Sequence, residues 1–171
     1  MTSRWTSNTR LRRHTEADIP FMKALYRSTR ETELRRMPLT PAQADVFIEQ
    51  QFHSQLAYYT GHYSKDHLDI VEVDAQPAGR LFVDYRSSEI RIIDITLAAS
   101  FRGQRLGEFL LRHVIAQSQR RVLPITIHVD HDNPARRLYE RMGFCLKDEA
   151  SRIYLRMERQ PDTAPMQPAR R

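Results

Sequence analysis

A chain of 171 residues with 40% apolar and 28% charged side chains fits one soluble globular domain with a single core. It contains no run of about 18 apolar residues, which argues against a membrane-spanning segment, and its first residues lack the apolar core of a secretory signal. A single cysteine, Cys145, cannot form an internal disulfide. We therefore expect a cytoplasmic protein.

The formal net charge of +6 is concentrated at the two ends of the chain. The first 13 residues hold four arginines and no acidic residue, whereas the middle of the chain is nearly neutral. A nucleic-acid interface would need a basic face on the folded part, so the charge argues against nucleic acid as a partner. The alternative is that the protein binds nucleic acid through its two basic ends alone.

Both ends also differ from the middle in composition. Residues 1–8 (MTSRWTSN) are polar apart from Trp5, and residues 161–171 are rich in proline. Such segments resist both helix and sheet. We expect flexible tails at 1–8 and 161–171 on either side of one domain at 9–160.

The first half of this domain begins with a short edge strand and two helices. The strand is expected at 9–14, and Thr15 with Asp18 forms a capping box for a helix that follows. Thr40 and Pro41 then occupy the cap and first position of a helix that runs toward Gly61. The hydrophobic period next changes to two, which predicts an antiparallel meander of strands at 67–74, 78–85 and 89–99.

The second half starts with a crossover unit. An amphipathic helix is expected at 106–121 and an alternating strand at 124–129. A strand, a helix and a second strand in this order place the strands at 89–98 and 124–129 parallel in one sheet. The sequence therefore predicts an α/β protein with a mixed sheet.

The loop before this helix, in FRGQRLGEFLL (101–111), contains two of the five glycines in the chain. Gly103 and Gly107 allow close approach to the backbone, and a helix N-terminus offers unpaired N–H groups to an anion. Arg102 and Arg105 add positive charge, so the loop favours a phosphate or pyrophosphate. The alternative is a tight turn with solvated arginines, since a glycine-rich turn alone is a weak signal.

A second motif, DNPARRLYERMGF (132–144), follows the strand at 124–129. Asn133 can cap a short helix, with Pro134 at its first position, and Gly143 ends it. Helical spacing places Tyr139 on the inward face, so its phenol is directed into the interior or a cleft.

Together the two motifs closely resemble the GNAT superfamily of acyl-CoA-dependent N-acyltransferases, over most of the chain. The usual loop pattern Q/R-x-x-G-x-G/A is matched by Arg102 and Gly107, with Arg105 where glycine is usual, and the second motif, N-x-x-A-x-x-L-Y-x-x-x-G-F, is matched in full from Asn133 to Phe144. The resemblance implies a GNAT-like, mostly antiparallel twisted sheet flanked by helices. It also implies a V-shaped splay between the strands near 89–98 and 124–130.

The resemblance further implies how acetyl-CoA would be bound as cosubstrate. The backbone of the loop would hold the pyrophosphate, the end of the preceding strand would pair with the pantetheine arm, and Asn133 would meet the arm nearby. The implied cofactor-binding residues are Ile95, Thr96, Leu97, Arg102, Gly103, Gln104, Arg105, Leu106, Gly107, Glu108 and Asn133.

In this family a tyrosine at the position of Tyr139 is commonly the acid that protonates the departing thiolate. A phenol with an ordinary pKa of about 10 is mostly protonated at neutral pH and can supply that proton. A core tyrosine with its hydroxyl bonded to backbone is the alternative. For the base that deprotonates the amine, Asp94 is the first candidate, although it could also be a solvated residue on the polar face. Glu89, Asp130 and an ordered water are weaker ones.

Two further patterns need an interpretation. HVDHD (128–132) holds potential metal ligands, but alternate residues of a strand point to opposite faces, so we expect no metal. Tyr58, Tyr59 and Tyr63 could line an acceptor pocket or belong to the core.

The predicted function is an N-acetyltransferase that moves an acetyl group from acetyl-CoA to the primary amine of a small molecule or peptide. A catalytically inactive acyl-CoA sensor is the alternative. The resemblance suggests that the acceptor pocket lies within roughly 26–64, and it makes a homodimer possible. The sequence does not identify the acceptor.

Overall fold

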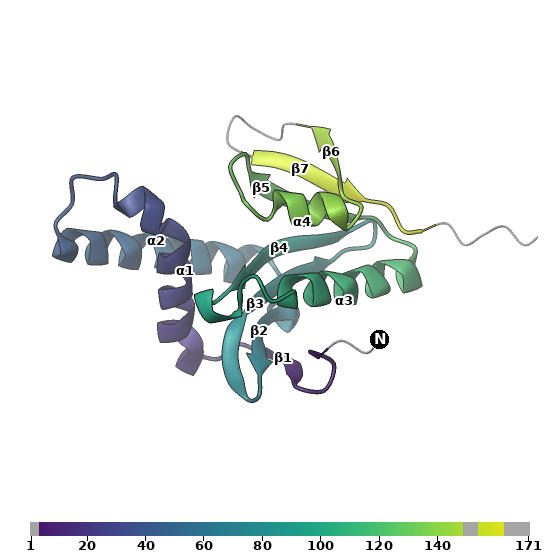
Figure 1. The fold of residues 1–171 in the computed structure, drawn as a ribbon, viewed down its shortest axis with the longest axis horizontal. Coiled ribbons are helices and arrows are strands. Elements are labelled where there is room, and N and C mark those ends of the chain that lie inside the picture. The colour runs from purple at the N-terminus through teal and green to yellow at the C-terminus, as the bar shows by residue number, and fades with distance from the viewer. Residues whose placement is uncertain (1–3, 149–153, 163–171) are drawn as a thin grey trace, which may run out of the picture. The chain divides into compact units, whose positions relative to one another are not determined.

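The computed structural model describes residues 4–148 and 154–162. Within these residues, seven strands form one mixed sheet in the order β1-β2-β3-β4-β5-β7-β6, and helices pack against it (Figure 1). The elements are β1 (Thr9–Arg13), α1 (Ile19–Leu34), α2 (Pro41–His62), β2 (Leu68–Val73), β3 (Gln76–Tyr85), β4 (Ile90–Leu97), α3 (Leu106–Arg121), β5 (Ile125–Asp130), α4 (Arg136–Arg141), β6 (Cys145–Asp148) and β7 (Tyr154–Arg159).

The pairing of the strands confirms the predicted mixed, mostly antiparallel sheet. β1 with β2 and β2 with β3 are antiparallel, as are β5 with β7 and β6 with β7. β4 and β5 are parallel, with Ile90–Ile92 opposite Ile125–Ile127. This parallel pair is the one that the crossover through the α3 helix predicted.

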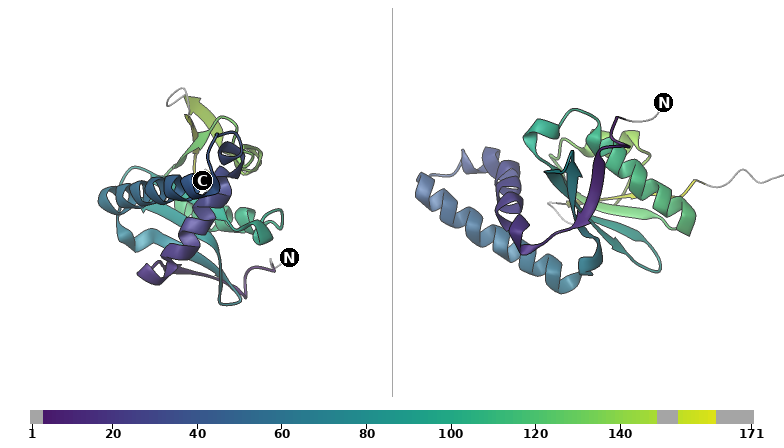
Figure 2. Two further views of the ribbon diagram at one scale, coloured as in Figure 1. Left: turned by 90° about the vertical axis from the view of Figure 1, so that its left-hand side faces the viewer. Right: turned by 90° about the horizontal axis from the view of Figure 1, so that it is seen from below.

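The chain divides into two compact units, residues 4–84 with 94–107 and residues 85–93 with the rest. In the first unit, α1 crosses α2 (Figures 1 and 2). The rings of Tyr26 and Phe52 lie 6.1 Å apart between these helices, and both side chains are buried. On the more solvent-exposed side of this contact, Lys23 Nζ and Glu49 Oε2 form an ion pair at 2.5 Å. The helices pack through buried residues at helical spacing, Met22, Leu25 and Tyr26 on α1 and Ala44, Ile48 and Phe52 on α2.

Both predicted helix starts are confirmed. At α2, the backbone N–H of Gln43 donates to the hydroxyl of Thr40 at 3.3 Å, and the Gln43 side chain accepts from the Thr40 N–H at 2.8 Å. Before α1, the Thr15 N–H donates to Asp18 at 2.8 Å. Asp18 is buried, and its carboxylate also accepts two hydrogen bonds from the Arg12 guanidinium, at 2.7 and 2.8 Å. These charge-assisted bonds lower the pKa of Asp18 to about 2.

Gly79 marks a very close backbone approach between β3 and the end of β4. A Cβ atom at this position would lie 2.4 Å from the carbonyl oxygen of Thr96 and 2.8 Å from the side chain of Leu97. The N–H of Ala98 donates to the carbonyl of Ala78 at 2.9 Å beside it. The missing side chain therefore lets the end of β4 lie directly against β3.

Residues 4–8 differ from the flexible tail that their composition suggests. Trp5 is buried, with 4% of its surface exposed, and the turn that follows is closed by the Thr9 N–H donating to the Trp5 carbonyl at 3.1 Å. The backbone of Asn8 then accepts from Asp74, in the β2–β3 turn. One large apolar side chain gives this otherwise polar segment enough buried area to hold it on the first unit. Most of the predicted C-terminal tail, at 163–171, lies outside the described residues.

The second unit contains β5, β6, β7, α4 and most of α3. β7 lies antiparallel to β5 from Ile125 opposite Arg159 to Asp130 opposite Tyr154. The sequence pattern alone delimits neither β6 nor β7, because β6 has four residues, all exposed, and β7 buries only Leu155 and Met157. Within the described parts of the chain, no helix has both the length and the apolar character of a membrane span.

Candidate active site

The loop between β4 and α3 is built on two residues in the left-handed backbone region. Gly103 has φ +69° and Arg105 has φ +66°. Glycine adopts this conformation freely, but a residue with a Cβ pays roughly 1 kcal/mol or more for it. The loop therefore requires at Arg105 the conformation that glycine, the usual residue there in the GNAT pattern, provides without strain.

The two arginines of this loop have different surroundings. Arg102 donates from Nε to the Leu97 carbonyl and from Nη2 to the Ser28 hydroxyl, both at 2.8 Å, and so ties the end of β4 to α1. Arg105 is exposed and forms no hydrogen bond or ion pair within residues 4–148 and 154–162. Only the charge of Arg105 is thus uncommitted and available to a bound anion.

Asp94 belongs to a buried network in the first unit. Its Oδ2 accepts from Arg80 at 2.6 Å and its Oδ1 from the Thr96 hydroxyl at 2.7 Å. The same Arg80 nitrogen also reaches the Gln55 side chain on α2 at 2.8 Å. The Asp94 side chain is only 11% exposed. It is therefore an ion-paired, part-buried carboxylate rather than a solvated residue on a polar face.

The other two carboxylates considered as the base lie in the second unit. Glu89 is engaged by three neighbours: Arg86 at 2.9 Å, Arg91 at 3.3 Å and the Thr126 hydroxyl at 2.9 Å. Asp130 ends β5 and its carbonyl accepts from the Asn133 N–H at 3.0 Å. Glu89 thus has an evident structural role in joining β4 to β5.

Tyr139 lies in α4, where the predicted motif places it facing inward. It is 3% exposed, and its ring meets that of Phe144 edge-on at 5.9 Å. Gly143, at φ +86°, reverses the chain so that the Phe144 N–H donates to the Tyr139 carbonyl at 3.0 Å. The glycine and the phenylalanine of the motif therefore fix the orientation of the Tyr139 ring.

Asn133 closes the turn before this helix, whereas the cap position itself is Ala135, which makes no side-chain cap bond. The Oδ1 of Asn133 accepts from the Ala135 N–H at 2.8 Å. Because this turn uses the oxygen, the amide NH2 group is the part of Asn133 that remains to donate to a cofactor arm. The regular helix begins at Arg136, slightly later than the motif suggests.

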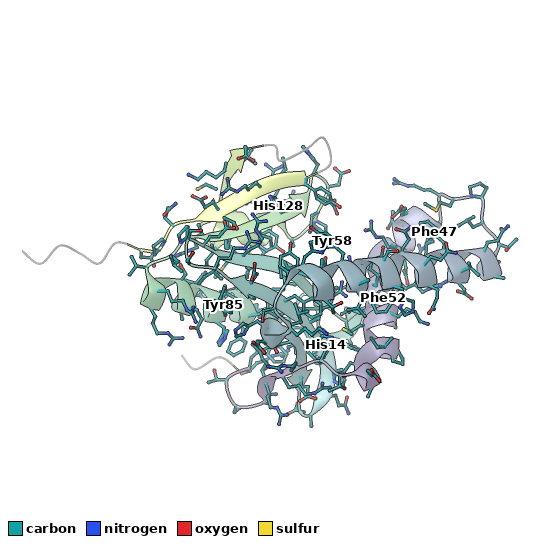
Figure 3. All side chains as sticks on the ribbon, turned by 180° about the vertical axis from the view of Figure 1, so that it is seen from behind. His14, Phe47, Phe52, Tyr58, Tyr85 and His128 are labelled. Carbon is teal, nitrogen blue, oxygen red and sulfur yellow. The ribbon has the colours of Figure 1, made fainter. Side chains whose placement is uncertain are left out.

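The tyrosines at the end of α2 divide between core and surface. Tyr59 packs edge-on against Phe82 at 5.9 Å. Tyr58, labelled in Figure 3, is 51% exposed and stacks on His62 at 4.1 Å. The ring centre of Tyr63 lies 6.2 Å from the ring centre of Tyr58 and 6.2 Å from that of Tyr59. Of the two alternatives, Tyr59 fits core packing, and Tyr58 is the tyrosine with a ring surface open to a ligand.

The HVDHD segment contains His128, which lies opposite Arg156 across β5 and β7. Burial lowers the pKa of His128, and the charges of Arg91 and Arg156 lower it further. Over residues 4–148 and 154–162, no three side chains of the metal-ligating types are grouped closely enough to hold an ion.

The described residues thus contain a glycine loop that enters α3, a motif tyrosine on α4 and a mixed sheet in which β4 and β5 are parallel, which are the elements of a GNAT-like fold. Residues 25–144 match the Acetyltransferase (GNAT) family, and the chain belongs to this family. It is an acetyltransferase that uses acetyl-CoA, as this family does in general. A search of curated proteins found no match to the sequence.

Solved structures agree with this assignment at the level of the fold. The PaiA N-acetyltransferase from Thermoplasma acidophilum, solved in complex with coenzyme A, superposes with a TM-score of 0.64 at 12% identity over 89% of this chain and 98% of that one. The ribosomal-protein-S18-alanine N-acetyltransferase from Escherichia coli gives 0.59 at 16% identity, over 92% and 97%. An acetyltransferase from Thermus thermophilus gives 0.67 at 15%, over 90% and 97%.

Two residues beside the candidate site were not singled out from the sequence. Arg80 reads as one residue of a predicted strand, although a charged side chain inside the apolar run AGRLFVDY, with Asp94 in the next strand, is a signal for a buried pair. Trp5 was assigned to a tail. Its signal is that it is the only tryptophan of the chain, in a segment with no other large apolar side chain after Met1.

Proposed function

We propose that this acetyltransferase transfers the acetyl group of acetyl-CoA to a primary amine of a small molecule or peptide, by direct attack of the amine on the thioester. The loop conformation at Gly103 and Arg105 carries the proposal, because it brings bare backbone and an uncommitted guanidinium to the start of α3. Both features suit a pyrophosphate. The loop residues 102–108 would bind that group through their backbone.

Acetyl-CoA binding would involve two further segments besides this loop. The half-buried end of β4, Ile95 to Leu97, would pair with the pantetheine arm as an added strand does. The amide NH2 group of Asn133 would donate to the same arm. The splay between β4 and β5, expected from the family resemblance, would admit the thioester.

In the reaction, a neutral amine nitrogen bonds to the thioester carbon, the carbon–sulfur bond breaks with its electron pair on sulfur, and a proton reaches the thiolate. Tyr139 would supply that proton from its phenol. A base must also remove a proton from the amine. Each oxygen of Asp94 already accepts one hydrogen bond, so a water held by Asp94 suits this step as well as the carboxylate itself.

The acceptor amine would enter beside α1 and α2, where the exposed Tyr58 offers an aromatic surface. Peptide and small-molecule amines are both compatible with it. The E. coli neighbour is named for a protein alanine substrate and another neighbour, from Neisseria gonorrhoeae, is an N-acetylglutamate synthase. A screen of both amine classes is therefore the direct way to identify the acceptor.

The experiment that tests the proposal is a calorimetric titration with acetyl-CoA, followed by an amine screen that measures release of free CoA thiol. Saturable binding and amine-dependent thiol release support it. Binding without release by any amine would favour the alternative, a protein that binds acyl-CoA as a sensor. Absence of binding would refute the proposed role of the loop as the pyrophosphate site of acetyl-CoA.

A further inference from the structure

The N-terminal segment is bonded to the main chain of the candidate pyrophosphate loop. The indole Nε1–H of Trp5 donates to the backbone carbonyl of Gln104 at 3.2 Å. Gln104 stands between Gly103 and Arg105, the two residues in the left-handed region. The buried Trp5 therefore fixes the peptide at the centre of this loop.

The side chain of Gln104 is held as well. Arg4 donates to its Oε1, and its Nε2 donates to the carbonyl of Ser100. The guanidinium of Arg4 also lies 4.0 Å from the centre of the Trp5 ring. Arg4 and Trp5, which we call the N-terminal clasp, thus hold both the main chain and the side chain of one loop residue.

Holding the Gln104 carbonyl has a consequence for the next N–H group. In a trans peptide the carbonyl of one residue and the N–H of the next point in opposite directions, and the described residues contain no cis peptide. Since the Gln104 oxygen is turned toward Trp5, the Arg105 N–H is turned away from it. The same contact helps to hold Arg105 at φ +66°, a conformation that persists only where the surroundings enforce it.

We propose that Trp5 is a positioning residue for the pyrophosphate subsite: its indole N–H sets the direction of the Arg105 N–H and maintains the loop in its anion-binding form. This inference rests on the proposed function of the loop. Trp5 acts on the loop through the Gln104 carbonyl. Its effect should therefore appear in the binding of the pyrophosphate and not in the binding of the pantetheine arm.

The test compares two ligands in the full chain and in Trp5→Phe, which keeps a buried ring but removes the N–H donor. Coenzyme A contains the pyrophosphate and pantetheine lacks it, so pantetheine is the internal control for packing. In calorimetric titrations, loss of one hydrogen bond to the loop should raise the Kd of coenzyme A roughly three- to tenfold. The Kd of pantetheine should stay the same.

A second measurement needs no variant, because Trp5 is the only tryptophan of the chain. Coenzyme A should change the tryptophan emission of the unaltered protein, and pantetheine should leave it unchanged. This readout keeps the inference testable even if Trp5→Phe folds poorly.

Three results would overturn the inference. These are an unchanged Kd of coenzyme A in Trp5→Phe, an equal loss of affinity for both ligands, and tryptophan emission that coenzyme A does not alter. Failure of the unaltered protein to bind coenzyme A would refute the proposed function itself, and is recognised before any substitution is made.

Discussion

Arg80 and Asp94 form a buried ion pair between neighbouring strands of the first unit, with Nη2 and Oδ2 2.6 Å apart and the arginine only 2% exposed. Thr96 and Gln55 complete its hydrogen bonds, but the Nε atom of Arg80 is buried without a partner among the described residues. Such a pair contributes little net stability but is costly to break on one side.

Arg80→Met should therefore lower the free energy of unfolding by about 3 kcal/mol, because it leaves the Asp94 carboxylate buried without its countercharge. Arg27→Met, which breaks the exposed pair with Asp45, is the matched control and should cost about 1 kcal/mol or less. Urea denaturation of both variants measures the difference. Equal losses in the two variants would contradict a structural role for the Arg80–Asp94 pair.

Tyr139→Phe should reduce kcat about 100-fold, since a positioned general acid contributes on that order, while the Kd of acetyl-CoA stays unchanged. The phenylalanine ring preserves the contact with Phe144, so the melting temperature should change little. Tyr154→Phe, which alters a half-exposed tyrosine of the same unit, is the control. A kcat equal to that of the unaltered enzyme would remove Tyr139 from the acid role.

Arg105→Gly and Arg105→Ala both remove the guanidinium, but only glycine removes the strain of the left-handed backbone. The glycine variant should be more stable than the alanine variant by about 1 kcal/mol in chemical denaturation. If the guanidinium pairs with the pyrophosphate, both variants should bind acetyl-CoA more weakly, and Arg105→Lys should retain part of the affinity. Tighter binding by Arg105→Gly than by the unaltered protein would mean that the arginine obstructs the loop.

Stability in acid should depend on Asp18. Its pKa is about 2 in the folded protein, below the ordinary value near 4, so the unfolded chain takes up the proton first. The stabilisation is complete above about pH 4 and is lost as the pH falls toward 2, by roughly 2 kcal/mol. Denaturation at several pH values should show this loss in the unaltered protein, and Asp18→Asn should show a flatter profile. Parallel profiles would assign the acid sensitivity to other carboxylates.

The sequence predicted well those features that depend on local pattern. The capping residues Thr15 and Thr40, the parallel pairing of β4 with β5 and the inward direction of Tyr139 all follow from spacing and cap chemistry, and the structure confirms them. The contacts of Asp94 depend on Arg80, fourteen positions away, and those of Trp5 on a loop nearly one hundred positions away. The sequence marks Arg80, Asp94 and Trp5 as unusual in their segments, but it does not give their contact partners, because these meet only when the chain folds.

The outermost strands of the sheet have a consequence for how copies of the protein behave in concentrated solution. β1, at one end of the strand order, has three arginines among its five residues, and β6, at the other end, is fully exposed and carries Lys147. A strand at a sheet edge can recruit a strand from another molecule and start aggregation, and charged side chains along the edge oppose that approach. The arginines of β1 are ion-paired with Glu72, Asp18 and Asp66, so a partner strand could pair with β1 only by displacing or desolvating these charges.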